Sequence, residues 1–339
     1  MRAMRAAIAA LAVAVLAAAP AHAVEIHAHR GGPIENGVAT SPEDTRPAFE
    51  RGYSLGTDVV ELDAKITADG VPVVIHDATL DRTTDCTGRV DAKTLAELAA
   101  CHVDTVGTDP VLKPSPGSQV AVPPLSEVLA WAKAGRVRLN LEIKNIPTDP
   151  DYDPSPAFAR TILGAVDASG IPRGLVLIQS FWPPDLDEAH AQGFRTSFLT
   201  LAQTNDQSVE YAQARGYEVL SPQWPVSKSF VERAHAAGKQ VVPYTFNAED
   251  EVTAAKEAGV DAVITNDVLV AERSLYGIDC PTARRQESTL RAALVKARAA
   301  RARARKGEPR RKADAKVRRV NQKRQAIKRL RRRACGPGG

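Results

Sequence analysis

Seven side chains able to bind metal ions, anions or protons stand where short apolar segments of this sequence end. They are His29, Arg30, Glu61, Asp63, His76, Glu142 and Lys144. Two of the segments end in a pair of such residues separated by one position, Glu-Leu-Asp and Glu-Ile-Lys. Alternate residues of a strand point to the same face, so the members of each pair would lie on one face.

Brought together, these residue types would suit a metal-dependent reaction at a phosphate group. Three carboxylates that converge repel one another unless a cation lies between them. Oxygen ligands without cysteine indicate a hard cation, either Ca²⁺ or Mg²⁺. The basic pair could hold phosphate beside that cation, and the two histidines could act as general acid and base. We therefore predict one divalent cation bound by Glu61, Asp63 and Glu142, catalysis by His29 and His76, and substrate binding by Arg30 and Lys144.

Each motif also has a purely structural explanation when taken alone. The Glu-Leu-Asp segment could be a solvated strand face, and the Glu-Ile-Lys segment could be an ion pair on one face. Phe181 and Tyr244 follow predicted strands, where an aromatic ring can either pack or contact a substrate. We assign both rings to substrate binding. His27, two positions before His29, is predicted to pack inside the fold.

The elements that must position these residues alternate between short strands and amphipathic helices from residue 24 to 277. The predicted strands are residues 26–29, 59–63, 73–76, 139–143, 175–180, 196–199, 219–221, 240–245 and 262–265. Helical segments between them favour a parallel sheet with helical crossovers. With about eight such repeats, the fold class is α/β and the best prediction is a (β/α)8 TIM barrel, which carries its chemistry at the carboxyl ends of its strands.

One of these predicted strands is too many for that barrel, and the sequence does not say which. Residues 65–71 are too few for a helical crossover and contain Asp69-Gly70, a turn signal. We therefore expect the regular alternation of strand and helix to break between residues 63 and 73.

The first 23 residues have the pattern of a signal peptide. Arg2 and Arg5 precede an apolar run from Ala6 to Ala19, and Ala21-His22-Ala23 follows as a small-residue cleavage site. The apolar run is short for a bilayer span, so cleavage is favoured over a membrane anchor. We therefore expect a secreted, periplasmic or cell-envelope protein.

Export would place the four cysteines in an oxidising compartment, where disulfides persist. Four cysteines allow about three pairings. One is a local bridge between Cys86 and Cys101, which leaves Cys280 and Cys335 to tie the C-terminus to the end of the core. The sequence has no Cys/His metal spacing, which argues against zinc.

The C-terminal residues differ sharply in charge from the rest. From residue 283 to 335 there are about 22 basic and about 3 acidic residues, against about 21 basic and about 37 acidic ones in residues 24–282. We therefore divide the chain into a signal peptide (1–23), a barrel (24–282) and a basic tail (283–339). Self-repulsion predicts that the tail is disordered or conditionally helical. It could be a solvated extension or could attach the protein to an anionic membrane or cell-wall surface, and no specific nucleic-acid partner is expected.

The ordered set of motifs resembles that of the glycerophosphodiester phosphodiesterases. The matching segments include His29-Arg30-Gly31, Pro42-Glu43-Asp44-Thr45, Glu61-Leu62-Asp63, His76-Asp77, Leu141-Glu142-Ile143-Lys144, Ser180-Phe181 and Ile264-Thr265-Asn266. They run in order over nearly all of residues 25–275. Asp44 stands where the family usually has Asn and adds a negative charge near the site. Tyr244 replaces a usual Trp and Asn266 a usual Asp, which bears on the head group more than on the reaction.

This resemblance implies a barrel of the phospholipase C-like phosphodiesterase type that hydrolyses small glycerophosphodiesters to glycerol 3-phosphate and an alcohol. Attack could use the glycerol hydroxyl of the substrate, through a cyclic phosphate, or water directly. Glu43 is expected to lie behind the metal ligands. One alternative is a phospholipase D-like enzyme acting on lysophospholipid or sphingomyelin head groups. Another is a non-catalytic protein that binds anionic surfaces, which the presence of both histidines disfavours.

Overall fold

The computed structural model describes residues 24–103, 120–202, 205–277 and 280–303, with Asp314, Lys316, Val317 and Lys328 beyond them. The predicted signal peptide, residues 1–23, lies outside the described residues. Most of the basic tail beyond residue 303, including Cys335, lies outside them as well.

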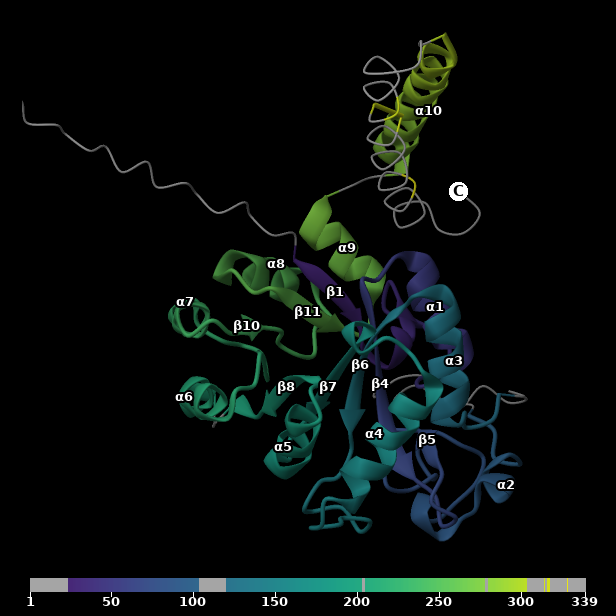
Figure 1. The fold of residues 1–339 in the computed structure, drawn as a ribbon, viewed down its shortest axis with the longest axis vertical. Coiled ribbons are helices and arrows are strands. Elements are labelled where there is room, and N and C mark those ends of the chain that lie inside the picture. Colours follow the sequence, from purple (N-terminus) through teal and green to yellow (C-terminus); the bar gives the residue numbers. More distant parts are fainter. Residues whose placement is uncertain are drawn as a thin grey trace, which may run out of the picture.

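Parallel strands form a barrel surrounded by helices (Figure 1). The strands of the barrel are β1 (Glu25–Ala28), β4 (Val59–Ile66), β6 (Arg138–Ile143), β7 (Val176–Ser180), β8 (Arg195–Thr200), β9 (Val219–Pro222), β10 (Gln240–Val241) and β11 (Ala262–Thr265). They are hydrogen-bonded in the order β10-β9-β8-β7-β6-β4-β1-β11. Two backbone hydrogen bonds bring β11 beside the β10 segment. The N–H of Asp261 donates to the carbonyl of Val241 at 2.9 Å, and the N–H of Ile264 donates to the carbonyl of Pro243 at 3.0 Å. The predicted TIM barrel is therefore confirmed.

Helices in the connections between strands cover the outside of the barrel (Figure 1). They are α1 (Arg46–Leu55), α3 (Leu125–Gly135), α4 (Ala157–Ser169), α5 (Pro183–Ala191), α6 (Asn205–Arg215), α7 (Lys228–Ala236), α8 (Glu249–Ala258) and α9 (Val268–Tyr276). Short elements in the connections are η1 (His29–Gly31), β2 (Ile34–Glu35), β3 (Val38–Ala39), η2 (Val90–Ala92), α2 (Leu95–Leu98) and η3 (Arg173–Leu175).

Alternation along β4 separates polar side chains that face the barrel interior from apolar ones beneath the helices. On β4, Val60, Leu62 and Ala64 belong to the large buried apolar cluster. Glu61 and Asp63 lie between them and therefore point to the opposite face. Burying each large aliphatic side chain contributes about 1.5–3 kcal/mol, so this layer decides which face of the strand is turned toward the barrel axis.

The extra predicted strand is β5 (Pro72–Val74), which pairs antiparallel with β4 and lies off the barrel path. The interpretation that His76 ends a barrel strand was therefore wrong. Strand β4 runs on past the barrel, the chain turns at Asp69-Gly70, and β5 returns alongside it with Val74 opposite Ala64. The expected break in the alternation of strand and helix occurs here.

A small lobe follows β5 and has its own apolar cluster, which includes Leu80, Val90, Leu98 and Val103. A disulfide joins Cys86 to Cys101 across this lobe, which is the local pairing that the sequence allows. The expected second bridge, to Cys335, falls outside the described residues. The lobe packs beside the carboxyl end of β4, because Val73 and Ile75 of the returning segment belong to the same cluster.

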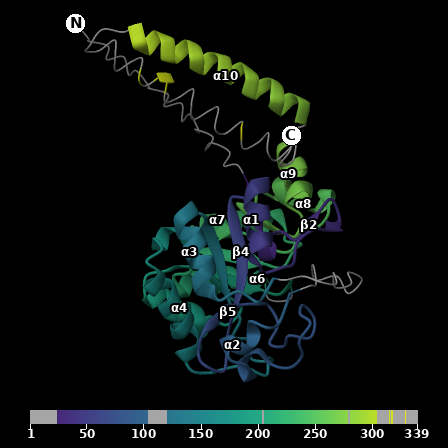
Figure 2. The same cartoon turned by 90° about the vertical axis from the view of Figure 1, so that its right-hand side faces the viewer.

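The beginning of the basic tail forms a helix, α10 (Cys280–Arg303), which is drawn apart from the barrel (Figure 2). Its alanine, leucine, lysine and arginine content favours helix. Among the described residues, no helix is both long enough and apolar enough to cross a membrane.

Candidate active site

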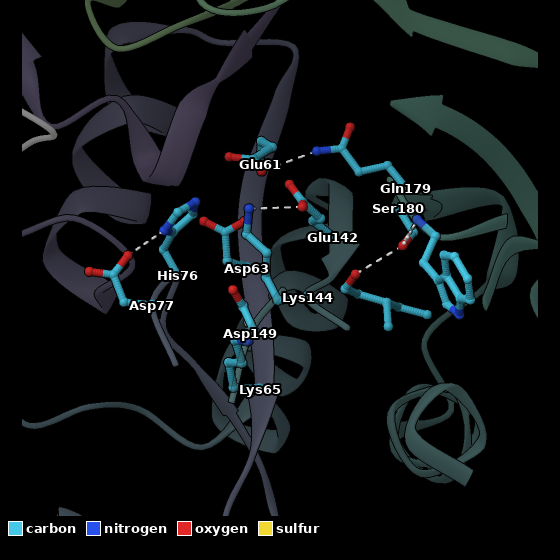
Figure 3. Close-up of polar contacts among 12 residues, drawn as sticks. Glu61, Asp63, Lys65, His76, Asp77, Glu142, Lys144, Asp149, Gln179 and Ser180 are labelled. Atoms are coloured by element: carbon cyan, nitrogen blue, oxygen red, sulfur yellow. Dashed lines mark hydrogen bonds and ion pairs between the residues drawn. The ribbon is translucent and has the colours of Figure 1, made fainter. Parts of the chain in front are cut away.

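Strand register brings the polar side chains of the site together. Asp63 on β4 lies opposite Glu142 on β6, and Glu142 lies opposite Gln179 on β7. On the other side of β4, Ala28 of β1 pairs with both β4 and β11, so His29 emerges between those two strands. Figure 3 shows the carboxylates facing one another, with His76 on one side and Gln179 on the other. The site therefore lies at the carboxyl ends of the barrel strands, as predicted.

Glu61, Asp63 and Glu142 form a buried acidic cluster, in which one carboxylate oxygen from each residue lies within 4.8 Å of the other two. Burial, together with the charges of the other two carboxylates, raises the pKa of Glu61 well above its ordinary value. Burial also raises the pKa of Glu142 to about 7. The charge of Lys144 opposes this rise, and the charge of Asp63 adds to it. Such carboxyls stay ionised together only with compensating positive charge.

The cluster has the donor atoms that a hard cation requires. Both carboxylate oxygens of Asp63 and Oε1 of Glu142 are buried, and none of the three has a hydrogen-bond partner among the described residues. They do form ion pairs, with Arg30 and Lys144. Carboxylate oxygens with free lone pairs are the preferred ligands of Ca²⁺ and Mg²⁺. The three predicted ligands therefore converge on one site that is able to hold a metal ion.

Arg30 is positioned by its backbone as well as by its side chain. Its φ of 49° lies in the left-handed region, and the following Gly31 has a φ of 89°. A Cβ at Gly31 would come within 2.8 Å of atoms of α1, so this tight approach of η1 requires glycine. The turn lets the Arg30 N–H donate to Glu61 Oε2 at 2.7 Å. Its Nη1 donates to Glu43 Oε1 at 2.9 Å, and its Nε lies 3.1 Å from Asp63 Oδ2.

Lys144 contacts two members of the acidic cluster. Its Nζ lies 2.8 Å from Glu142 Oε1 and 3.5 Å from Asp63 Oδ1, and it stands 6.0 Å from the centre of the Phe181 ring. The same-face ion pair considered from the sequence thus exists, and it lies inside the predicted site. Burial alone would raise the pKa of Asp63, but the nearby positive charges, Lys144 first, hold it below its usual range.

His29 is hydrogen-bonded through Nδ1. Nδ1 lies 2.6 Å from Oδ1 of Asn266, and Nδ2 of Asn266 donates to Oδ1 of Asn247 at 2.9 Å. Burial and then the charge of Arg30 lower the pKa of His29 to about 3. The imidazole is therefore neutral near pH 7, with one nitrogen protonated and the other carrying a lone pair.

His76 is hydrogen-bonded to a carboxylate instead. Its Nδ1 lies 2.5 Å from Asp77 Oδ1, and Arg82 Nε donates to the other oxygen of Asp77 at 2.5 Å. Arg82 Nη2 also donates to Glu43 at 2.7 Å, and Glu43 in turn accepts from Arg30. A continuous chain of charged contacts thus connects His76 to Arg30. Burial, followed by the charge of Lys144, lowers the pKa of His76 to about 4.

These side chains open into a cavity of about 230 Å³. Of the predicted site residues, its lining includes His29, Arg30, Glu61, His76, Glu142, Lys144, Phe181 and Tyr244. The rings of Phe181 and Tyr244 meet edge to face, 5.9 Å apart, and the Tyr244 hydroxyl donates to the carbonyl of Thr200 at 3.0 Å. Asp63 lies in the acidic cluster beside the cavity, and Glu43 lies behind Arg30, so the structure brings all of the predicted residues together.

The structure adds residues to which the sequence analysis assigned no role. Gln179 Nε2 donates to Glu61 Oε1 at 3.2 Å, and Asn140 Nδ2 donates to Gln179 Oε1 at 2.8 Å. Asn140 also approaches His27, which is buried in the barrel as predicted. Polar residues inside otherwise apolar strands, such as Leu-Ile-Gln-Ser, were the available signal. These side chains support Glu61 from the barrel interior.

Asp44, the added carboxylate noted in the sequence, lies beside the acidic cluster. The side chain is buried, and its Oδ1 accepts from the backbone N–H of Asp63 at 3.3 Å. Burial and then the Asp63 charge raise its pKa well above the ordinary value. Burial and the neighbouring carboxylate therefore both disfavour its charged form.

A model of the glycerophosphoryl diester phosphodiesterase family matches residues 29–270. A glycerophosphodiester phosphodiesterase of Bacillus altitudinis is 29% identical over 250 residues, which cover 71% of this chain and 94% of that protein. Two of the similar solved structures illustrate the shared fold. One, from Parabacteroides distasonis, is a glycerophosphodiester phosphodiesterase with a TM-score of 0.60 and 20% identity, covering 76% of this chain and 98% of that one. The other, an Oleispira antarctica phosphodiesterase in complex with the product sn-glycerol-3-phosphate, has a TM-score of 0.60 and 24% identity, covering 74% and 96%.

Proposed function

Because this chain belongs to the glycerophosphoryl diester phosphodiesterase family, we propose that it hydrolyses glycerophosphodiesters to glycerol 3-phosphate and an alcohol. The chain is a phosphodiesterase of that family. The observation that carries the proposal is one cavity lined by two histidines, two basic side chains and part of the acidic cluster. The glycerol 3-phosphate bound to the Oleispira antarctica phosphodiesterase supports the same substrate class.

The substrate phosphate would bind beside Arg30 and Lys144. Both side chains are almost fully buried and lie at the edge of the acidic cluster. A guanidinium and an ammonium in a site with little water neutralise the charge that develops on phosphoryl oxygens. Phe181 and Tyr244 line the same cavity and would contact the glycerol or the head group.

His29 and His76 would move the protons of the reaction. One histidine removes a proton from the attacking hydroxyl, which belongs either to the glycerol of the substrate or to water. The other must enter this step as the charged imidazolium, a form that a neighbouring carboxylate such as Asp77 favours. It then donates a proton to the oxygen of the departing alcohol, so the proton that is taken up balances the proton that is released. Both imidazoles line the cavity that would hold the substrate, which supports this assignment.

Glu61, Asp63 and Glu142 would hold one divalent cation, Ca²⁺ or Mg²⁺. When bound, such an ion polarises a phosphoryl oxygen and lowers the pKa of a coordinated hydroxyl. Gln179 and the Arg30 N–H each donate to one oxygen of Glu61 and so fix the orientation of that carboxylate.

The test is a coupled assay for glycerol 3-phosphate release. We expect release from glycerophosphocholine or another glycerophosphodiester, and loss of release when EDTA removes the cation. Sphingomyelin and lysophospholipid serve as the competing substrates. Turnover of those alone would favour the phospholipase D-like alternative, and turnover of no phosphodiester would favour the non-catalytic binding protein.

We also propose that the protein is exported and that its basic tail attaches it to an anionic membrane or cell-wall surface. The basic, apolar and small-residue order of residues 1–23 supports export. The excess of about 19 positive charges in residues 283–339 supports attachment, because polybasic segments gain roughly 1 kcal/mol per residue near an anionic surface.

A further inference from the structure

The two histidines of the site differ in the chemistry of the group that contacts Nδ1. His76 has a carboxylate there, Asp77 Oδ1 at 2.5 Å. His29 has a neutral amide oxygen, Asn266 Oδ1 at 2.6 Å. A carboxylate stabilises a protonated imidazole, whereas a neutral oxygen accepts one N–H without supplying charge. The histidines are therefore not equivalent, although both line the same cavity.

The orientation of the Asn266 amide is set by a second amide. Asn266 Nδ2 donates to Asn247 Oδ1 at 2.9 Å, which leaves Asn266 Oδ1 facing His29. An amide oxygen only accepts hydrogen bonds, so Nδ1 of His29 must carry the hydrogen. In a neutral imidazole the lone pair then belongs to Nε2.

We propose that Asn266 is a positioning residue that holds His29 in the Nδ1-protonated form and thereby presents Nε2 as its proton acceptor. This inference rests on the proposed function for its kinetic consequence. Asn266 stands at the end of β11 and His29 at the end of β1, and the pairing of Ala28 with Thr265 fixes the two side chains side by side. Asn266, one of the positions that depart from the usual family motif, thus selects the tautomer of His29.

The direct test is nuclear magnetic resonance on the full-length protein with ¹⁵N-labelled histidine. Long-range proton–nitrogen correlations distinguish a protonated ring nitrogen from one with a lone pair, and a His29→Ala sample identifies the His29 signals. We expect the hydrogen on Nδ1 and the lone pair on Nε2 near pH 7.5. His102 serves as a reference in the same spectrum, because its Nδ1 lies 2.9 Å from the carboxylate oxygen Oδ2 of Asp85. The hydrogen on Nε2 of His29 would overturn the proposal.

Two variants of nearly equal size separate positioning from packing. Asn266→Leu removes the acceptor oxygen, and we expect the tautomer to be lost and kcat to fall by at least about tenfold, part of the ~10²–10⁴-fold that a general base contributes. Asn266→Asp keeps an acceptor oxygen, so kcat at the alkaline plateau should be largely retained. A purely structural role would instead leave the His29 tautomer and the pH profile of the active variants unchanged.

The Asn266→Asp variant should also move the acidic limb of the kcat/KM profile to higher pH. The groups that act on His29 in the wild-type protein are Arg30, Asp63 and His76 together with the neutral Asn266. Adding a carboxylate at this distance favours the charged imidazole and shifts the limb by roughly 1 unit or more. An unmoved limb together with an Nε2 hydrogen would refute the positioning role. Absence of any glycerophosphodiester turnover in the wild-type protein would refute the proposed function instead, and the spectrum would still report the tautomer.

Discussion

Ile75 donates its backbone N–H to the carbonyl oxygen of Asp63 at 3.0 Å. This hydrogen bond extends the antiparallel pairing of β5 with β4 by one residue beyond the Ala64–Val74 pair, in the direction of the barrel. The residue after Ile75 is His76, so the hairpin delivers a histidine beside the acidic cluster from a strand that does not belong to the barrel. The geometry of the hairpin therefore controls the position of His76.

Gly70→Ala should lower kcat by loosening this hairpin. Gly70 has a φ of +77° with open space around it, so the substitution acts through backbone strain, which costs about 1–2 kcal/mol. Gly238→Ala is a matched control, because Gly238 has a φ of +72°, is equally open and follows α7 away from the hairpin. We expect similar losses of stability in denaturant melts, with a fall in kcat only for Gly70→Ala. Equal kcat values in the two variants would contradict the role of the turn.

Glu61→Gln should weaken metal binding by at least about tenfold, since it removes one ligand charge from the acidic cluster. Titration calorimetry with Ca²⁺ and with Mg²⁺ measures this directly, and excess metal should partly restore activity. Glu127→Gln on α3, whose side chain is 52% exposed, is the control for loss of a carboxylate elsewhere. Unchanged affinity in Glu61→Gln would remove this residue from the ligand set.

His29→Ala and His76→Ala should each reduce kcat by roughly 10²–10⁴. The double variant should lose much less than the product of the two effects, because the two groups act as a unit. His235→Ala removes an exposed histidine paired with Asp261 and should leave kcat unchanged. Near-normal turnover in one of the two site variants would exclude that histidine from proton transfer.

Asp185→Asn should flatten the dependence of stability on pH. Asp185 is buried at the start of α5, and burial, followed by the charge of Asp153, raises its pKa to about 7. A carboxyl with a raised pKa in the folded state binds more protons there than in the unfolded state, so stability falls as pH rises from about 4 to about 7. The loss is at most about 4 kcal/mol for a shift of this size. Urea unfolding at pH 4 and pH 8 should give a smaller difference for the variant, and an equal difference would show that Asp185 does not titrate in this range.

Deletion of residues 283–339 should leave turnover of small glycerophosphodiesters intact, because every proposed site residue, including the positioning residue Asn266, lies before residue 267. The same deletion should abolish sedimentation with anionic vesicles, and binding of the full-length protein should weaken as salt screens the charges. A Cys280→Ser change in the truncated protein controls for the cysteine left behind. Equal binding by both proteins, or binding insensitive to salt, would leave the tail as a solvated extension.

The sequence by itself determined which side chains share a strand face and which end of each strand carries them. Glu61 with Asp63, and Glu142 with Lys144, follow from the period of two along a strand, which is a local property of the chain. The alternation of strands and helices likewise predicted the barrel, and the family motifs predicted the residues that line its cavity. Local spacing was sufficient for the shared strand faces because the residues of each pair are neighbours in the sequence, whereas the barrel and the motifs were read from the order of segments along the chain.

Only the tertiary structure decided how residues from different strands meet. The Asp63–Glu142–Gln179 row depends on the register of three strands, and the contact of His29 with Asn266 joins residues 237 positions apart. That the segment before His76 turns back along β4, rather than joining the barrel, also depends on which neighbouring backbone groups remain unpaired. Hydrogen-bond register and barrel closure are properties of the whole sheet, so no short stretch of sequence specifies them.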